Sequence, residues 1–245
     1  DSDLGKLILQ NFDEVSANTF QHLIDASAAI RARVQAAGGQ VRYSAYGYHG
    51  TEILIEGQYT WQTYTNYTQG LAKMRLERIA QAAWAQGVKA TVYNCPEIRT
   101  NSSDIFAGVE LPLVGLLAAL KQENGGAWAQ AQWQACGELL ADGITVDDML
   151  AKVEAFHTSD VMRPFRNFAA WPMPNAAEQA DLTIGTSDEV QKMHKDPKAL
   201  VTDLLSSLVI EATGPLMFRE SSAPSGPVLW LNHDIIARQL NQLHA

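Results

Sequence analysis

The chain has 245 residues, of which 47% are hydrophobic and 18% are charged, and its formal net charge at pH 7 is −9. This composition is typical of a globular protein, and the excess of acidic residues argues against a surface that binds nucleic-acid phosphates. Two cysteines, Cys95 and Cys136, are too few for a disulfide framework and favour a reducing cytoplasm. No apolar run reaches the roughly 20 residues of a membrane helix, and no signal peptide opens the chain, so no membrane partner is expected.

The first part of the chain alternates between strand-like and helix-like segments. Lys6–Phe12 is short and apolar enough for a buried strand, and apolar residues at helical spacing follow in Ser16–Ala37. A second strand is predicted at Gln40–Tyr48, a helix at about Tyr67–Gln86, and a third strand at Val88–Cys95. Alternating strands and helices predict an α/β fold, here a Rossmann-like parallel sheet flanked by helices.

The predicted sheet has one edge at which a ligand is expected. In open parallel sheets, ligands bind at the carboxyl ends of the strands. Two loops, at residues 46–50 and 94–103, leave strands at that end. Between them, Thr51–Gln58 is an ambiguous apolar segment that precedes a run rich in tyrosine. This arrangement predicts that the tyrosine-rich run lies between two walls of one site.

The remainder of the chain predicts a helix-rich C-terminal elaboration. A very apolar helix at Ile105–Lys121 is expected to be buried or to line a pocket, and a capping box at Thr186–Glu189 predicts a helix start. Further elements are predicted at Ala127–Leu140, Val146–Ala155, 187–194, 197–210 and Val228–Leu231, with a last helix from Asp234. We therefore expect a single α/β domain over 1–245. Its parts are a sheet core at 1–104, a mostly helical elaboration at 105–210, and a closing strand and helix at 211–245.

Common cofactor and metal motifs are absent from the sequence. It contains neither the Gly-x-Gly-x-x-Gly turn that cradles a dinucleotide nor the glycine-rich loop that holds a nucleoside triphosphate. The six histidines are dispersed and form no pair at i, i+4, so no metal is expected. No Gly-x-Ser-x-Gly turn is present to hold a nucleophilic serine.

The stretch Gly57–Ala80 concentrates tyrosines and one lysine where a helix is predicted to begin. A phenol can donate a proton, and a nearby ammonium can lower its pKa and bind a polar ligand. Aromatic residues before a helix also commonly serve only for packing. Tyr64 and Lys73 are nine positions apart, which places them on opposite faces of a continuous helix. They can converge only if Tyr64 precedes the helix in an extended segment.

Three segments resemble the NADH-dependent trans-2-enoyl-CoA and enoyl-acyl-carrier-protein reductases of the FabV and Ter type, a divergent branch of the short-chain dehydrogenases. Tyr64-Thr-Asn-Tyr-Thr-Gln-Gly-Leu-Ala-Lys73 looks like their Tyr-x8-Lys signature. Upstream, Tyr46-Gly-Tyr48-His-Gly50-Thr-Glu-Ile53 is similar to a segment that carries a second active-site tyrosine. Downstream, Thr100-Asn-Ser-Ser103 and Leu111-Pro-Leu-Val-Gly-Leu-Leu look like a Thr/Ser turn and an apolar helix that covers the acyl site.

The resemblance implies a reaction and a set of site residues. A hydride from NADH or NADPH would go to the β-carbon of an enoyl thioester, and Tyr64 would stabilise or protonate the enolate. Lys73 would hold the nicotinamide ribose and tune Tyr64, while Tyr48 would support the carbonyl. Thr100 is assigned to the cofactor, and Ser102, Ser103, Phe106 and Leu113 are assigned to the substrate. The implied partner is acyl-CoA or an acyl-carrier protein.

The resemblance leaves open whether this chain is an enzyme by itself. Members of the family carry a long amino-terminal half with the glycine-rich NADH loop, and this chain starts after the point where that half ends. Catalysis would then need a second chain or the missing half. One alternative is a non-catalytic structural or docking module of a larger fatty-acid or polyketide assembly. Another is a small-molecule binding domain that uses Tyr48, Trp61, Tyr64 and Phe106.

Overall fold

The chain forms two compact units. The computed structural model describes residues 2–47, 50–62, 68–101, 107–166 and 177–245. Unit 1 comprises Asp1–His49, Thr65–Cys95 and Pro215–Trp230. Unit 2 comprises Gly50–Tyr64, Pro96–Gly214 and Leu231–Ala245. Each unit is therefore built from three separate stretches of the chain.

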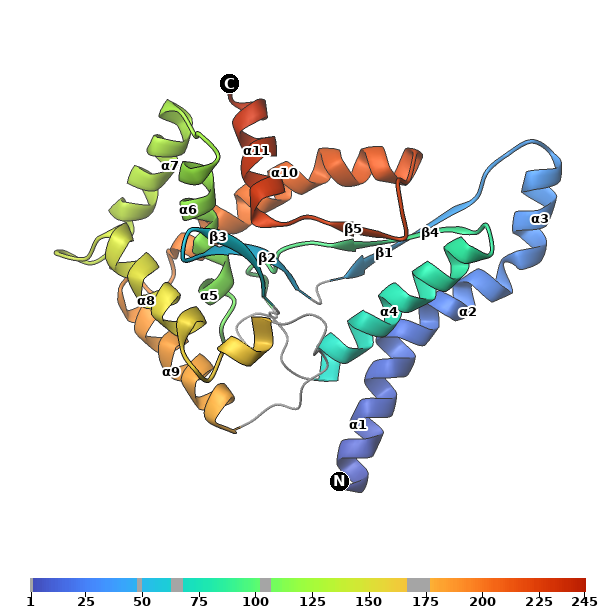
Figure 1. The fold of residues 1–245 in the computed structure, drawn as a ribbon, viewed down its shortest axis with the longest axis horizontal. Coiled ribbons are helices and arrows are strands. Elements are labelled where there is room, and N and C mark those ends of the chain that lie inside the picture. Colours follow the sequence, from blue (N-terminus) through green and yellow to red (C-terminus); the bar gives the residue numbers. More distant parts are fainter. Residues whose placement is uncertain (1, 48–49, 63–67, 102–106, 167–176) are drawn as a thin grey trace. The chain divides into compact units, whose positions relative to one another are not determined.

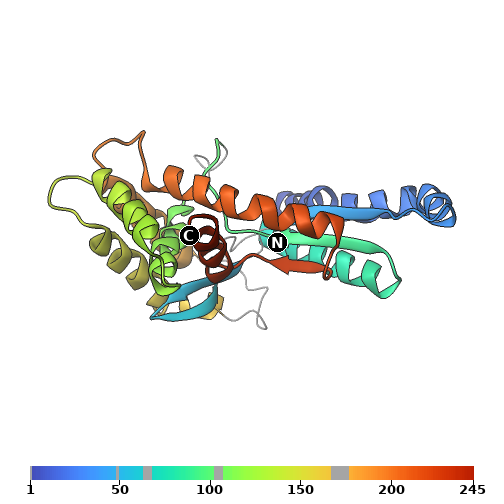
Figure 2. The same cartoon turned by 90° about the horizontal axis from the view of Figure 1, so that it is seen from above.

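Unit 1 is organised around a parallel sheet. Within the described residues this sheet has the strand order β1 (Arg42–Gly47), β4 (Lys89–Asn94), β5 (Val228–Trp230). The β1–β4 register runs from Arg42 opposite Lys89 to Gly47 opposite Asn94, and Figure 2 shows β5 along the other side of β4. The parallel sheet flanked by helices confirms the predicted Rossmann-like α/β class with a helical elaboration.

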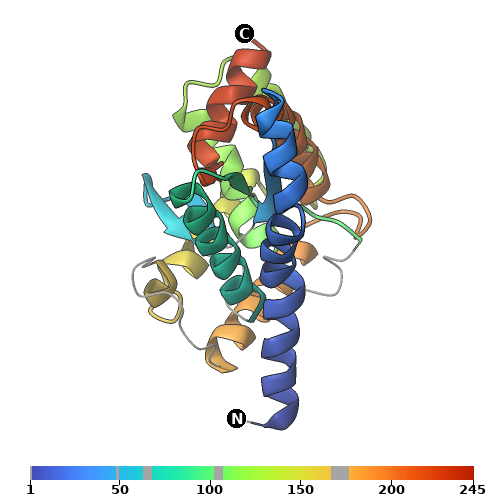
Figure 3. The ribbon, with the colours of Figure 1, turned by 90° about the vertical axis from the view of Figure 1, so that its right-hand side faces the viewer.

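One face of the sheet is covered by α4 (Thr68–Ala85), as Figure 1 shows. Against α4 lies a nearly continuous rod made of α1 (Asp3–Asp13), the π-helical turn η1 (Glu14–Asn18) and α2 (Thr19–Ala26), as Figure 3 shows. Apolar side chains from these helices and from two strands form the core of unit 1, which contains Ala17, Phe20, Ile24, Tyr43, Leu76, Ala80, Ala83, Ala90 and Val92.

The opposite face of β4 meets the chain that follows Pro215. Side chains alternate between the two faces of a strand, so Ala90 and Val92 face the core while Thr91 and Tyr93 point the other way. The hydroxyl of Thr91 donates to the carbonyl of Gly226 at 2.8 Å, and that of Tyr93 donates to the carbonyl of Met217 at 3.5 Å. All residues of β4 after Lys89 are buried, as expected for a central strand that is covered on both faces.

The predicted strand at Lys6–Phe12 is wrong, because these residues lie in α1. The side chain of Ser2 caps the helix by accepting a hydrogen bond from the Gly5 amide at 3.1 Å, and Asp3 lies in the favourable first turn. A short apolar run does not by its pattern distinguish a strand from a helix. The apolar residues of α1 are mostly exposed, among them Leu4, Leu7, Ile8 and Leu9.

The helix predicted over Ser16–Ala37 is interrupted. It is divided into η1, α2 and α3 (Ala28–Ala36), with a break at Ser27 between the last two. The Ser27 hydroxyl lies 2.6 Å from the Leu23 carbonyl and 2.6 Å from the Tyr43 hydroxyl. Serine competes for backbone hydrogen bonds in this way, and the tertiary contact with Tyr43 cannot be read from helical spacing.

Unit 2 begins with a β-hairpin that the sequence pattern left ambiguous. Strands β2 (Thr51–Ile55) and β3 (Gln58–Gln62) pair antiparallel. They are joined by Glu56 and Gly57, both of which have positive φ, 51° and 71°. This is the conformation that a two-residue hairpin turn requires.

Helices make up most of the rest of unit 2. The described helices are α5 (Glu110–Leu113), α6 (Gly115–Gln122), α7 (Ala127–Glu138), α8 (Val146–Thr158), the 3-10 turn η3 (Arg163–Arg166), α9 (Ala177–Lys192), α10 (Val201–Ser222) and α11 (His233–Leu243). The residues of α10 from Pro215 on belong to unit 1. α6 lies in the middle and packs against β2, α7, α8 and α11. All side chains of α5 and most of those of α6 are buried, as expected for this apolar run. The single helix predicted at Ile105–Lys121 is wrong within the described residues, because the run is divided into α5 and α6 and its helical part begins only at Glu110.

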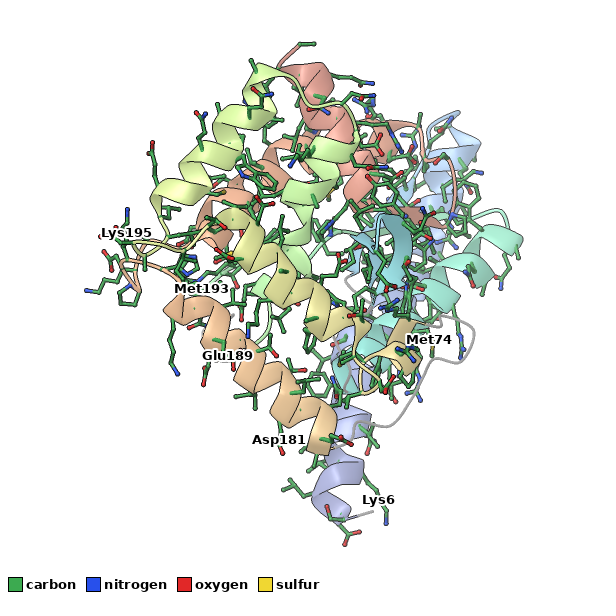
Figure 4. All side chains as sticks on the ribbon, turned by 60° about the vertical axis from the view of Figure 1, so that its left-hand side comes forward. Lys6, Met74, Asp181, Glu189, Met193 and Lys195 are labelled. Carbon is green, nitrogen blue, oxygen red and sulfur yellow. The ribbon has the colours of Figure 1, made fainter. Side chains whose placement is uncertain are left out.

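Helices α8 and α9 lie side by side, as Figure 4 shows. Lys152 of α8 donates to the carboxylate of Glu189 on α9 at 2.7 Å. A capping box between Thr145 and Asp148 fixes the start of α8. The capping box predicted at Thr186–Glu189 is wrong, because these residues lie inside α9.

α10 is longer than predicted and continues through Pro215 to Ser222. By length and composition it could cross a membrane, yet 44% of its most apolar window is buried within the structure. The core helix of a globular protein meets the same criterion, so α10 is weak evidence for a membrane span.

Replacing Leu76 by alanine tests the core of unit 1. Leu76 is 3% exposed, and a buried Leu→Ala change leaves a cavity, so the free energy of unfolding should fall by about 2 to 5 kcal/mol. Leu4, which is 67% exposed, is the matched control, and Leu4→Ala should change it by less than about 0.5 kcal/mol. Urea unfolding of both variants measures this difference. Equal effects would contradict the assigned core.

Candidate active site

The carboxyl edge of the sheet in unit 1 carries the described part of the predicted active site. β1 ends at Gly47 and β4 ends at Asn94, directly opposite each other. Lys73 lies in the second turn of α4, which begins at Thr68. Its Nζ atom donates to the main-chain carbonyl of Tyr46 at 3.0 Å. Because Tyr46 is the penultimate residue of β1, this contact places the Lys73 ammonium at the edge where parallel sheets bind ligands.

Partial burial changes the acidity of Lys73. Desolvation disfavours the charged ammonium and lowers the pKa of Lys73 from its ordinary value. The hydrogen bond to Tyr46 fixes the direction of the side chain. A lysine with a lowered pKa and a fixed orientation can donate hydrogen bonds to a polar ligand and assist a neighbouring acid.

A buried polar pair lies beside Lys73 at the same edge. The side-chain amide of Asn94 donates to Oε1 of Glu77 at 2.6 Å, and the two residues are 0% and 3% exposed. Glu77 is four residues after Lys73, so both side chains lie on one face of α4. This pair therefore connects the end of β4 to the face of the helix that presents Lys73.

Gly47 leaves space for the Asn94–Glu77 pair because it has no side chain. A Cβ atom on Gly47 would lie 2.5 Å from Oδ1 of Asn94 and 2.8 Å from Cγ1 of Val92. Neither neighbour can move without disturbing the Asn94–Glu77 hydrogen bond or the core. The end of β1 is therefore restricted to glycine by packing.

The other face of the sheet carries two tyrosines near this edge. The rings of Tyr46 and Tyr93 are tilted at 57° with centroids 6.4 Å apart. The hydroxyls of Tyr93 and Ser44 lie 3.3 Å apart. Tyr46 is 69% exposed and offers an aromatic surface at the ligand edge.

Most of the residues that the resemblance implies lie outside the described residues. These are Tyr48, Tyr64, Ser102, Ser103 and Phe106. Their roles stay predictions.

Two further predicted residues, Thr100 and Leu113, belong to unit 2. Thr100 is exposed in the segment that follows β4. Leu113 is 0% exposed in α5 and contributes to the core of unit 2. Their assignment to the cofactor and the substrate stays a prediction, as does that of Lys73.

Unit 2 also contains a carboxyl group that the sequence pattern did not indicate. Burial, and then the nearby carboxylate of Glu110, raise the pKa of Glu97 to about 7. Glu110 is 4% exposed, and among the described residues its Oε1 atom has no hydrogen-bond partner. A carboxyl group that titrates near neutral pH can exchange a proton under physiological conditions. No three His, Cys, Asp or Glu side chains of the described residues gather into a metal site.

The Asn94–Glu77 pair was likewise not predicted from the sequence. Asn94 at the end of a predicted strand was the one available signal, since a polar residue at a carboxyl end faces the ligand edge. The partner could not be found, because it depends on how α4 is rotated against β4.

The known proteins that this chain resembles are described as enoyl-acyl carrier protein reductases. The family model described as Enoyl-acyl carrier protein reductase FabMG matches residues 1–240. The apo structure of FabMG, described as a novel type of enoyl-acyl carrier protein reductase, is 73% identical over 99% of this chain, with a TM-score of 0.93. An NADH-bound structure of FabMG is 65% identical over 99% of this chain, with a TM-score of 0.82. The chain spans 55% and 59% of those two chains. No curated protein matches it.

The substitution Gly47→Ala tests the contact between β1 and Asn94. The added methyl group should lower the free energy of unfolding by about 1 to 3 kcal/mol, because it overpacks a filled space. Gly185 is the control: it lies inside α9, and no heavy atom is within 4 Å of the position that an added methyl group would take. Gly185→Ala should therefore raise stability by about 0.5 to 1 kcal/mol. Thermal unfolding distinguishes the two signs. A neutral Gly47→Ala variant would contradict the packing constraint.

The titration of Lys73 tests its desolvation. After reductive methylation with 13C-formaldehyde, the Lys73 signal, identified by its loss in Lys73→Met, should titrate at a lower pH in folded protein than in urea-unfolded protein. Between the two midpoints the unfolded chain binds more protons, so stability should rise with pH across that window. Coinciding midpoints would show that burial does not affect this amine.

Proposed function

Because the chain belongs to the FabMG family of enoyl-acyl carrier protein reductases, we propose that it takes part in the NADH-dependent reduction of a trans-2-enoyl thioester. The observation that carries the proposal is the position of Lys73 at the carboxyl edge of the parallel sheet in a chain matched by that family over residues 1–240. The carrier of the acyl group is an acyl-carrier protein or coenzyme A, and the reaction takes place in the cytoplasm.

NADH, when bound, supplies the hydride that adds to the β-carbon of the double bond. The solved relative described as NADH-bound supports NADH over NADPH. In unit 1, the Lys73 ammonium fits such a ligand because it can donate to the ribose hydroxyls from a fixed direction. Thr100 is the second residue that we assign to the cofactor.

Acid catalysis is assigned to Tyr64. Its phenol donates a hydrogen bond to the thioester oxygen, where negative charge develops, and then gives up its proton. The ammonium of Lys73 lowers the pKa of a phenol near it, because an opposite charge favours the phenolate. Tyr48 donates a second hydrogen bond to the same oxygen. Ser102, Ser103, Phe106 and Leu113 hold the substrate.

The cradle for the NADH pyrophosphate lies, we propose, in the part of the family's length that this chain does not span. The sequence has no glycine-rich dinucleotide loop, and the solved relatives are considerably longer chains. The exposed leucines and isoleucine of α1 support this proposal, because a helix rarely exposes a row of large apolar side chains unless another surface covers them. The lack of the loop equally favours the alternative of a non-catalytic docking module.

NADH oxidation followed at 340 nm with a short trans-2-enoyl-CoA tests the reductase proposal on this 245-residue chain. We expect slow turnover that increases linearly with NADH concentration, since the pyrophosphate is not held. Tyr64→Phe should lower the rate by about a hundredfold or more, the usual contribution of a positioned acid. Lys73→Met should lower it as well, whereas Lys6→Met, which removes an exposed lysine of α1, should leave it unchanged.

Two outcomes would overturn the proposal. If the chain shows no turnover while a longer FabMG protein is active under the same conditions, the chain does not catalyse by itself. The docking module is then favoured if the substitution that corresponds to Tyr64→Phe leaves the longer protein fully active. If turnover survives Tyr64→Phe, another group is the acid.

A further inference from the structure

The N-terminal rod of unit 1 carries exposed apolar side chains along its length. α1 has no buried residue, although its sequence is rich in leucine. Leu4, Ile8, Val15 and Leu23 are 67%, 41%, 61% and 53% exposed. Helices in proteins are stabilised mainly by the packing of an apolar face. The sequence of the rod is therefore suited to a contact that the described residues do not supply.

These four residues lie on one side of the rod, and we call them the apolar row. Ile8 follows Leu4 by four residues and Val15 follows Ile8 by seven, spacings that return to the same face of an α-helix. Leu23 follows Val15 by eight residues, which is about one residue too many for two α-helical turns. The π-helical turn η1 lies between them, and its wider turn takes up the extra residue. The row therefore stays in phase over α1, η1 and α2.

The other side of the rod faces the sheet of unit 1. Phe20 and Ile24 belong to the same core as Tyr43 of β1 and the buried side chains of α4. The hydroxyls of Ser27 and Tyr43 lie 2.6 Å apart. The rod therefore covers β1 on the face of the sheet that α4 also covers. Figure 3 shows α1 projecting past the start of α4, so the apolar row lies at a border of unit 1.

β1 forms a border of the same unit. In the described sheet it is the outermost strand, because β4 lies on one side and no described strand lies on the other. Edge strands are commonly protected by prolines, bulges or several charges. β1 spans six residues without proline, pairs with β4 in regular register, and has Arg42 as its one charged residue. Its second edge is therefore suited to accept another strand.

The two solved relatives are longer than this chain. The similarity covers 99% of this chain but only 55% and 59% of those chains, so at least two fifths of each relative has no counterpart here. Because the rod covers the outermost strand of the sheet, an element that is added beside β1 also meets the rod. One further stretch of chain can therefore cover the edge of β1 and the apolar row together.

A second copy of the chain fits this border less well. A two-fold axis sets an edge strand antiparallel to its own copy, whereas the strands of the described sheet are parallel. A parallel neighbour within one chain needs a crossover connection, which is usually a helix that packs on a face of the sheet. A strand followed by such a helix supplies one partner for β1 and another for the rod.

We propose that the apolar row and the second edge of β1 form the docking surface for the part of the FabMG chain that this chain does not span. A strand of that part pairs parallel with β1, and a helix next to it packs its apolar side on the apolar row. The proposal rests on the proposed function in one respect, because the same part is the one to which we assign the cradle for the NADH pyrophosphate.

Glutamate substitutions in two proteins test the apolar row. In this 245-residue chain, Ile8→Glu should change the apparent melting temperature by less than about 2 °C, because the side chain is exposed. At the corresponding position of the 73% identical FabMG, glutamate should lower it by about 6 °C or more, because an unpaired charge is then buried. Gln10 is the matched control: it is exposed and lies two residues after Ile8, on the opposite side of α1. Gln10→Glu should change neither protein.

Hydrogen exchange followed by NMR tests the edge of β1. The amides of β1 that do not bond to β4 should exchange at least about a hundredfold more slowly in the longer FabMG than in this chain, because a paired strand opens only with its sheet. The amides of β4, the central strand, should be protected in both proteins. This measurement uses unsubstituted proteins, so it decides between the outcomes even where a glutamate variant fails to fold.

Each of three results contradicts the proposal. Equal effects of glutamate at the positions of the longer FabMG that correspond to Ile8 and Gln10 would show that the row is uncovered there. Equally fast exchange of the β1 amides in both proteins would show that no strand pairs with β1. A dimer of the longer FabMG that glutamate at the position of Ile8 converts to monomers, measured by sedimentation, would show that a second copy covers the row.

These measurements use neither NADH nor an enoyl thioester. A longer FabMG that reduces its substrate while its apolar row is uncovered therefore overturns this proposal alone. Conversely, a covered row in a protein without turnover leaves the docking surface in place and contradicts only the reductase proposal.

Discussion

The hydrogen bond between Asn94 and Glu77 fixes the geometry on which the sheet edge of unit 1 depends. A buried carboxylate is costly unless its oxygens are hydrogen-bonded, so α4 is held in the rotation about its axis that brings Glu77 to the end of β4. Lys73 lies one helical turn earlier on the same face, and this rotation directs it to the carbonyl of Tyr46. Gly47 completes the arrangement, because only a residue without a side chain leaves room for the amide of Asn94.

The parts of this geometry that follow from local pattern could be predicted from the sequence. The two strands β1 and β4 and helix α4 between them were predicted because each has a strong periodicity and a clear end. Lys73 was indicated by its spacing from Tyr64 in a resemblance to reductases. The Asn94–Glu77 pair could not be predicted, because it joins two elements whose relative rotation is set by tertiary packing. The same holds for the break at Ser27, which depends on Tyr43.

One wrong prediction and one ambiguous segment have a common physical origin, because both concern short segments. The apolar residues of α1 are compatible with either a strand or a helix, and a serine cap with an acidic first turn decides in favour of the helix. The hairpin of β2 and β3 was left ambiguous because Glu56 is an uncommon residue at positive φ. In both segments one or two residues at an end determine the structure. In unit 2 the apolar run was expected to be buried or to line a pocket, and two of its small residues, Gly115 and Ala118, line a cavity of about 410 Å³.

The order of strands in unit 1 has a consequence for how the chain folds as it is synthesised. The central strand β4 pairs on one side with β1, which precedes it closely, and on the other side with β5, where Val92 lies opposite Val228. The chain between β4 and β5 forms a long loop, and closing a long loop is slow. The second edge of β4 therefore stays unpaired until β5 has left the ribosome. During that interval β4 presents unpaired backbone groups along one edge, and such an edge can associate with other chains. A nascent chain of this protein is therefore most vulnerable to aggregation in the interval between the synthesis of β4 and that of β5.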